Sequence, residues 1–145
     1  GDVLPSPGQG ALGVEILLSE EAVKSLVQYL DHAPTRAAVV SEVAVLRELG
    51  GGCLLPVATL GRVSGGRLLL EASVTAADGS AQALARAEGD PLRPEELGVR
   101  VARQLIEYGA LDLLGDLAAA GGAGDAVPDA AGERSAGASG DPDAR

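Results

Sequence analysis

The sequence predicts an α+β fold, in which helices pack on one face of a three-stranded antiparallel sheet. Two features of the hydrophobic pattern support it: apolar residues recur at helical spacing before residue 50 and again after Pro94, and three strand-length segments lie between. Three consecutive short strands imply an antiparallel meander. The predicted order of two helices, three strands and a helix (ααβββα) therefore places the helices in a layer over one sheet face.

Two helices are expected ahead of the sheet. In the first, over residues 20–30, Ser19 is a suitable N-cap and two glutamates follow it in the first turn. The second begins at Pro34 or Thr35 and ends at three glycines, residues 50–52. Its apolar stripe consists of Val39, Val43, Leu46 and Leu49.

The three strands are separated by glycine-containing turns at residues 64–66 and 77–79, which have the chemistry of β-hairpins. The strand segments are residues 57–63, 67–75 and 80–88. Pro94 then stands at the first position of the third helix, which Gly109 ends, and a short helical continuation reaches about Leu117. The apolar positions of the third helix are Leu97, Val101, Leu105 and Ile106.

The chain divides into three parts by composition. Residues 19–117 carry the α+β pattern, whereas residues 118–145 are almost entirely small or polar, with Val127 as the larger aliphatic residue. Such a segment buries too little apolar surface to offset its ordering entropy, so we expect a disordered tail. Residues 1–18 open inside an ongoing strand-and-loop pattern without an initial Met, so we expect the chain to be a fragment of a longer protein.

The composition argues against several classes of function. The net charge of -10 disfavours nucleic acid or an anionic membrane surface as a partner. No apolar run approaches the roughly 18 residues that span a bilayer. A single cysteine excludes an internal disulfide and fits a reducing cytoplasm, and no cluster of Cys and His suggests a metal site.

The stretch SPGQGALGVE, residues 6–15, contains the spacing G-x-G-x-x-G at Gly8, Gly10 and Gly13. As a dinucleotide-binding turn it would need a strand before the first glycine and a helix at the last. Two prolines precede the glycines instead, and proline cannot donate to a central strand. Residues 14–18, which follow, have the pattern of a strand. We therefore reject the dinucleotide interpretation.

Cys53 is the residue best placed to carry chemistry. It follows the three glycines at the junction between the second helix and the first strand, where glycines let the backbone bend and a bulky group approach. A cysteine is reactive as the thiolate, which exposure and a positive environment favour. A lone cysteine is more often a small buried hydrophobe, and the residues alone leave both interpretations open.

Three further titratable residues have structural interpretations beside functional ones. Glu15 could hydrogen-bond the loop that contains Gly8, Gly10 and Gly13, or it could act in a functional site. Glu42 lies near the apolar stripe of the second helix, where an unpaired carboxylate would be costly, so we expect an ion pair with Arg36 or Arg47. His32 is expected in a solvent-exposed turn.

Two motifs, GQGALGVE (residues 8–15) and LGGGCLLP (residues 49–56), together resemble those of porphobilinogen deaminase, also called hydroxymethylbilane synthase. Members of that family carry G-Q-G-A-x-G-x-E and G-G-C-x-x-P segments at this separation. The resemblance covers about residues 3–117, the C-terminal part of such an enzyme. The order of elements in that family's third domain matches the predicted one.

The resemblance implies that Cys53 holds a dipyrromethane cofactor through a thioether, with Gly51 and Gly52 beside it and Gln9 as a polar contact to cofactor or substrate. That cofactor primes the joining of four porphobilinogen units, with loss of ammonia. Hydrolysis then releases hydroxymethylbilane, a linear tetrapyrrole of heme biosynthesis. Residues 1–18 would be the crossing strand and hinge by which the chain leaves the N-terminal domains.

The chain departs from the family pattern on the second helix, where the usual E-R-A-F-L is replaced by Glu42, Val43, Ala44, Val45 and Leu46. The family's catalytic aspartate and substrate-binding arginines belong to segments absent here, so no catalytic residue is expected in this chain. Porphobilinogen, the growing pyrrole chain and the missing N-terminal domains are then the expected partners. The alternative is a non-catalytic binding or structural remnant of the same domain.

Overall fold

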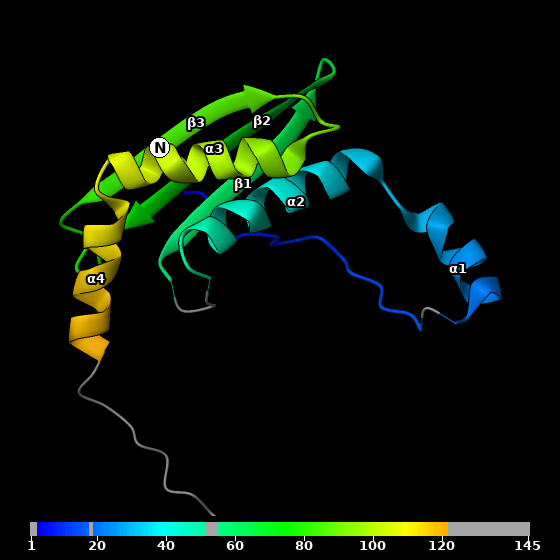
Figure 1. Ribbon diagram of the computed structural model, residues 1–145, viewed down its shortest axis with the longest axis horizontal. Helices are drawn as coiled ribbons and strands as arrows, with labels where there is room; N and C mark the ends of the chain where they lie inside the picture. Colours follow the sequence, from blue (N-terminus) through cyan, green and yellow to red (C-terminus); the bar gives the residue numbers. More distant parts are fainter. Residues whose placement is uncertain (1–2, 18, 52–54, 122–145) are drawn as a thin grey trace, which may run out of the picture.

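The computed structural model describes residues 3–17, 19–51 and 55–121, with no side-chain description for residues 116–121. It confirms the α+β class and the antiparallel three-stranded sheet (Figure 1). Its elements are α1 (Glu21–Val27), the 3-10 helix η1 (Gln28–Leu30), α2 (Ala33–Glu48), β1 (Val57–Ser64), β2 (Arg67–Thr75), β3 (Gln82–Gly89), α3 (Pro94–Glu107) and α4 (Ala110–Gly121).

The sheet has the order β1-β2-β3, with each strand antiparallel to the next. The loop between β1 and β2 consists of Gly65 and Gly66, which both have positive φ and therefore suit a tight hairpin turn. The register aligns Thr59 of β1 with Ala72 of β2 and Ala85 of β3, so these three side chains face the same side. This face of the sheet is the one that packs against α2 and α3.

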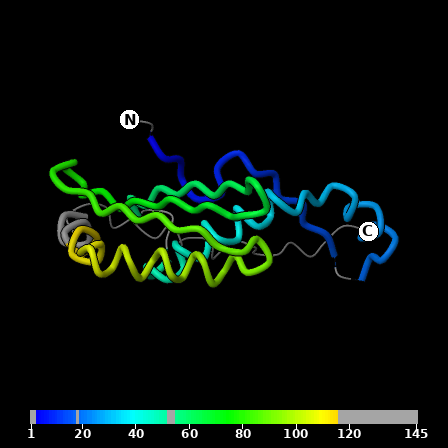
Figure 2. The backbone as a smooth tube through the Cα atoms, turned by 90° about the horizontal axis from the view of Figure 1, so that it is seen from above, coloured from blue at the N-terminus to red at the C-terminus, as the bar shows by residue number. Residues whose placement is uncertain are grey.

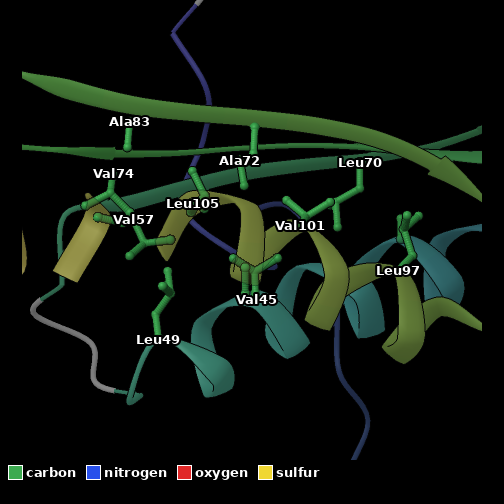
Figure 3. Close-up of a cluster of buried hydrophobic side chains, with 14 of the residues drawn as sticks. Val45, Leu49, Val57, Leu70, Ala72, Val74, Ala83, Leu97, Val101 and Leu105 are labelled. Carbon is green, nitrogen blue, oxygen red and sulfur yellow. The ribbon is translucent and has the colours of Figure 1, made fainter. Parts of the chain in front are cut away.

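The core lies between the sheet and a layer formed by α2 and α3 (Figure 2). Figure 3 shows side chains of both helices directed at the strands. The largest fully buried aliphatic side chains of this core are Val45, Leu68, Leu70, Val74, Leu97, Val101 and Leu105. The buried core in the described residues consists of Leu, Val and Ala and contains no aromatic residue.

The predicted apolar stripe of α2 is wrong in part. Leu49 is buried, but Val39, Val43 and Leu46 are only half-buried. The buried residues within α2 are instead mostly small: Ala37, Ala38, Ser41, Glu42, Ala44 and Val45. Small side chains are needed there because α2 lies very close to β1 and α3, as the glycines described below show.

The helix predicted at residues 20–30 forms as α1 and η1, but none of its residues is buried. Leu26 and Leu30 are each 71% exposed. Ser19 does not cap the helix, because Glu20 occupies the N-cap position and makes no side-chain capping bond. Figure 1 shows α1 well away from the sheet, and in the described chain it contacts no helix or strand other than η1. Its apolar side chains therefore lack a covering layer.

The third helix follows the prediction closely, with Leu97, Val101 and Leu105 buried and Gly109 following at positive φ. Helix α4 reaches Gly121, four residues beyond the predicted end at Leu117. The rest of the predicted tail, residues 122–145, lies outside the described residues. Within residues 3–17, 19–51 and 55–121, no helix combines the length and apolar character needed to cross a membrane.

Candidate functional site

Helix α2 ends in a Schellman motif at the glycine run. The Gly51 N–H donates to the Leu46 carbonyl at 2.9 Å and the Gly50 N–H to the Arg47 carbonyl at 3.1 Å. Both glycines have positive φ, of 105° at Gly50 and 64° at Gly51. These two glycines therefore have a structural reason to be present, which is to end the helix.

A substitution at Gly51 tests whether this glycine is needed to end the helix. Gly51→Ala is expected to lower the free energy of unfolding by about 1 to 2 kcal/mol, because an L side chain is strained at this φ although the described residues leave space for its Cβ. Urea denaturation followed by circular dichroism measures the change. Gly13→Ala is the reference substitution, because Gly13 is exposed, does not have a positive φ and has no described atom within 4 Å of an added Cβ. An equal loss in both variants would contradict the expectation.

Cys53 and Gly52 lie outside the described residues, as does Leu54. The structure describes the chain on both sides of them. Leu49 is buried at the end of α2, and Leu55 packs against the core just ahead of β1. Cys53 therefore belongs to a short connection whose two ends are held by the domain. Gly50 and Gly51 are exposed, and no described atom lies within 4 Å of a Cβ added at either position.

The glycine segment, defined as residues 3–10, forms a tight turn rather than a cofactor loop. The Gln9 N–H donates to the Ser6 carbonyl at 3.1 Å, and the Gln9 side-chain oxygen accepts from the Ser6 N–H at 3.1 Å. Within the described residues 3–17, no strand leads into Gly8 and no helix begins near Gly13. This arrangement agrees with our rejection of the dinucleotide interpretation. It also means that the carbonyl of the Gln9 amide is engaged within its own turn.

The strand predicted at residues 14–18 is wrong for the described part, residues 14–17, which has no regular structure. Val14 and Leu17 are 60% and 71% exposed. A strand needs a hydrogen-bonded neighbour, and the three-stranded sheet offers none to this segment. Glu15 is exposed and makes no hydrogen bond with a described residue.

The ion pair predicted for Glu42 does not form. Arg36 pairs with Asp31, with Nε–Oδ1 at 3.0 Å, and Arg47 lies 3.9 Å from Glu95. The Glu42 carboxylate is buried and accepts two backbone N–H bonds instead, from Gly8 and from Gly61, each at 2.7 Å. Two backbone N–H groups therefore stabilise the negative charge of Glu42, for which an arginine partner had been predicted.

The described parts of the two motifs lie at different positions along α2. Glu42 holds Gly8 near the middle of the helix, whereas Gly51 follows its C-terminal end. The helix segment from Glu42 to Glu48 spans roughly 9 Å. Gly8, the neighbour of Gln9, is therefore held more than one helical turn from the described glycines that precede Cys53. His32 is exposed as predicted, and its Nδ1 lies 2.8 Å from the Thr35 hydroxyl oxygen. The described residues contain no cluster of metal-binding side chains.

The β2–β3 turn perturbs the carboxyl of Asp78. The Ser80 hydroxyl, followed by the Ser80 backbone N–H, lowers the pKa of the Asp78 carboxyl below its ordinary value. Asp78 is fully exposed, so this is turn chemistry. It is unrelated to the cysteine loop.

Comparison with known proteins identifies the domain. Residues 37–107, which run from α2 to α3, match the family model described as "Porphobilinogen deaminase, C-terminal domain". This chain belongs to the porphobilinogen deaminase family. The matched region includes the cysteine loop, the glycines Gly61 and Gly98 and the whole sheet.

Curated relatives named porphobilinogen deaminase extend the match toward the N-terminus. The one from Desulforudis audaxviator is 47% identical over 111 residues, covering 77% of this chain and 36% of the relative. Those from Corynebacterium glutamicum and Thermus thermophilus are 46% and 41% identical and cover 79% and 81% of this chain, each over 39% of the relative. The chain thus spans less than two fifths of the length of these porphobilinogen deaminases.

Proposed function

We propose that this chain is the cofactor-bearing C-terminal part of a hydroxymethylbilane synthase of tetrapyrrole biosynthesis, working in the cytoplasm. Such an enzyme joins four porphobilinogen units on a dipyrromethane primer. The observation that carries the proposal is the match of the family's C-terminal domain across a loop that contains Cys53, the one cysteine of the chain. The reaction itself would need the rest of a family enzyme.

The residues beside Cys53 fit a covalently bound pyrrole pair. Gly50 and Gly51 leave open space at the end of α2, and Leu49 and Leu55 hold the loop ends on the core. The Cys53 sulfur would carry the thioether bond. When bound, the dipyrromethane supplies the primer to which porphobilinogen units are joined. This chain would contribute the anchor and the rigid domain behind it.

The proposed partner of this chain is the preceding part of a family enzyme, which makes up most of the length of the relatives. Several apolar side chains of the N-terminal arm, defined as residues 3–17 and 19–30, are exposed, with Leu12 97% and Leu26 71% exposed. A groove of about 530 Å³ between this arm and α2 is lined largely by apolar residues, among them Val14, Leu30 and Val39. Exposed apolar surface of this kind is typical of an interface.

The alternative is a domain that has kept the fold without the chemistry. Val43, half-buried on α2, stands where the family usually has an arginine. A remnant would keep the buried core and lose the cofactor. The state of Cys53 distinguishes the two possibilities.

An intact mass measurement tests the anchor. We expect the chain, purified after coexpression with the N-terminal portion of the Desulforudis audaxviator relative, to carry a two-pyrrole adduct that Cys53→Ser lacks. The substitution should cost about 1 kcal/mol of stability or less, because it exchanges one small atom in a glycine-flanked loop. The alternative, a domain that has lost the chemistry, would be favoured by a different result. In that result the wild-type chain stays unmodified in cells in which the full-length relative acquires its two-pyrrole adduct.

A further inference from the structure

Glu42 is a buried charge without a cationic partner. Its exposed fraction is 6%, and in the described part of the chain no Lys, Arg or His nitrogen lies within 4.0 Å of its carboxylate. A buried carboxylate is costly unless hydrogen bonds replace its hydration. Here both oxygens are used, Oε2 by the Gly8 N–H and Oε1 by the Gly61 N–H, each at 2.7 Å. These short distances are typical of charge-assisted hydrogen bonds.

The two donors are far apart in the sequence and belong to different parts of the molecule. Gly8 lies in the glycine segment, 34 residues before Glu42, and Gly61 lies in β1, 19 residues after it. One side chain on α2 therefore connects the helix, the sheet edge and the chain that enters the domain.

The packing of Gly61 makes the contact possible. A Cβ at this position would lie 2.9 Å from Ala38 Cα and 3.0 Å from the Ala38 carbonyl oxygen, so only glycine lets α2 approach β1 this closely. Ala38 is one helical turn before Glu42 and on the same face of α2. The close approach at Ala38 therefore brings the Gly61 amide within reach of the Glu42 carboxylate.

The edge of β1 provides a second attachment for the same segment. β1 is an outer strand, and its Thr59 N–H donates to the Pro5 carbonyl at 2.8 Å. Residues 59 and 61 are two apart, so both N–H groups point away from β2. The glycine segment is thus held at Pro5 by the strand edge and at Gly8 by Glu42. One attachment fixes a point, whereas two fix the direction of the chain.

We propose that Glu42 is a positioning residue whose carboxylate sets the direction in which the preceding polypeptide enters this domain. The proposal rests on the proposed function only in taking that polypeptide to be the rest of a family enzyme. In such an enzyme Glu42 would set how the cysteine-bearing domain stands relative to the parts that precede Gly8. It would act through the glycine segment and would not touch the cofactor or the substrate.

Hydrogen exchange of individual amides, measured by NMR on this chain, tests the contact. In Glu42→Gln the side chain keeps one acceptor oxygen and presents an NH₂ group to the other donor. We therefore expect the Gly8 or Gly61 amide to exchange at least about tenfold faster, as the loss of a charge-assisted hydrogen bond implies. Core amides such as Ala72 and Val101 should keep their rates. Glu48→Gln, on the same helix with Arg103 as its partner, is the matched control and should leave Gly8 unchanged.

A distance measurement tests the positioning role itself. Spin labels are placed at Val3→Cys, 94% exposed, and Leu84→Cys, 57% exposed, in a Cys53→Ser background. The distribution of distances between them should be narrow with Glu42 and clearly broader with Glu42→Gln. A residue that only stabilises the core would leave this distribution unchanged. If the variant unfolds, NMR coupling across the hydrogen bonds from Gly8 and Gly61 to the Glu42 carboxyl carbon provides the test in the native chain.

The proposal is overturned if the Gly8 amide of the native chain exchanges as fast as in an unstructured peptide. It is also overturned if Glu42→Gln changes neither the exchange rates nor the distance distribution. These measurements require no cofactor and no turnover. The role of Glu42 can therefore be confirmed even if Cys53 carries no cofactor. If Cys53 carries the cofactor but the Gly8 amide exchanges freely, the role of Glu42 is refuted and the proposed function is not.

Discussion

Gly98→Ala is expected to lower the free energy of unfolding by about 2 to 3 kcal/mol, a large effect for one methyl group. Gly98 lies in the middle of α3, facing α2. An added Cβ would lie 2.5 Å from Ala44 Cβ and closer still to the Ser41 carbonyl oxygen. Neither neighbour has a flexible end that could move aside. The two helices would have to separate, which would open the core around Val45 and Val101.

The matched control is the glycine of α4. In Gly115→Ala the described residues leave the Cβ with no neighbour within 4 Å, so helix propensity decides the effect. Alanine is favoured over glycine in a helix by about 1 kcal/mol, and this variant should be neutral or slightly stabilised. Urea denaturation of both variants, followed by circular dichroism, gives the comparison. Equal midpoints for the two variants would show that α2 and α3 are not packed as tightly as described.

The sequence was sufficient for the elements whose signals are local. The hairpin between β1 and β2 follows from a pair of glycines between alternating segments, and α3 follows from Pro94, a 3.6-residue period and Gly109. In each case residues close in the sequence specify both the conformation and the end of the element. The bounds of β1, β2 and α3 accordingly agree with the prediction to within one or two residues.

Features that depend on distant residues could not be predicted in the same way. The buried face of α2 is set by Gly61 and Gly98, which lie on two other elements and let the helix approach closely. The donors to Glu42 are backbone amides, which every residue except proline has, so no residue type in the pattern indicated them. A glycine inside a strand is a signal of close backbone approach, and Gly61 could have been recognised as such.

The prediction of the candidate site depended more on the resemblance of its motif to a family than on physical reasoning about its residues. The end of α2 at Gly50 and Gly51 follows from the rule that helices end at glycines with positive φ. The role proposed for Cys53 rests on the resemblance, because spacing alone cannot distinguish a reactive cysteine from a buried one. The amphipathic pattern of α1 correctly indicated a helix, but the pattern does not say which surface will cover the apolar side.

The chain by itself is expected not to convert porphobilinogen to hydroxymethylbilane. Each pyrrole unit carries two carboxylates, so the growing chain needs several cations gathered in one cleft. This chain has 11 Lys and Arg against 21 Asp and Glu. Seven of its cations each lie within 4.0 Å of a carboxylate: Lys24, Arg36, Arg47, Arg67, Arg86, Arg93 and Arg103. Arg100 donates to the Glu88 carbonyl at 2.7 Å.

Of these cations, Arg47 and Arg103 lie near the end of α2, where the primer would be held, and each of the two already faces a glutamate. The other cations are spread over the rest of the domain, so they do not form one cleft. Proton transfer at the leaving amine also needs an acid within hydrogen-bond reach of the substrate. An anchored primer without such groups gains no transition-state stabilisation. Purified chain is therefore assayed for hydroxymethylbilane with porphobilinogen, alone and mixed with the separately expressed N-terminal portion of the Desulforudis audaxviator relative. Turnover only in the mixture is expected, and it should be lost with Cys53→Ser. Turnover by the chain alone would mean that the described domain contains a complete cleft, which its ion pairs argue against.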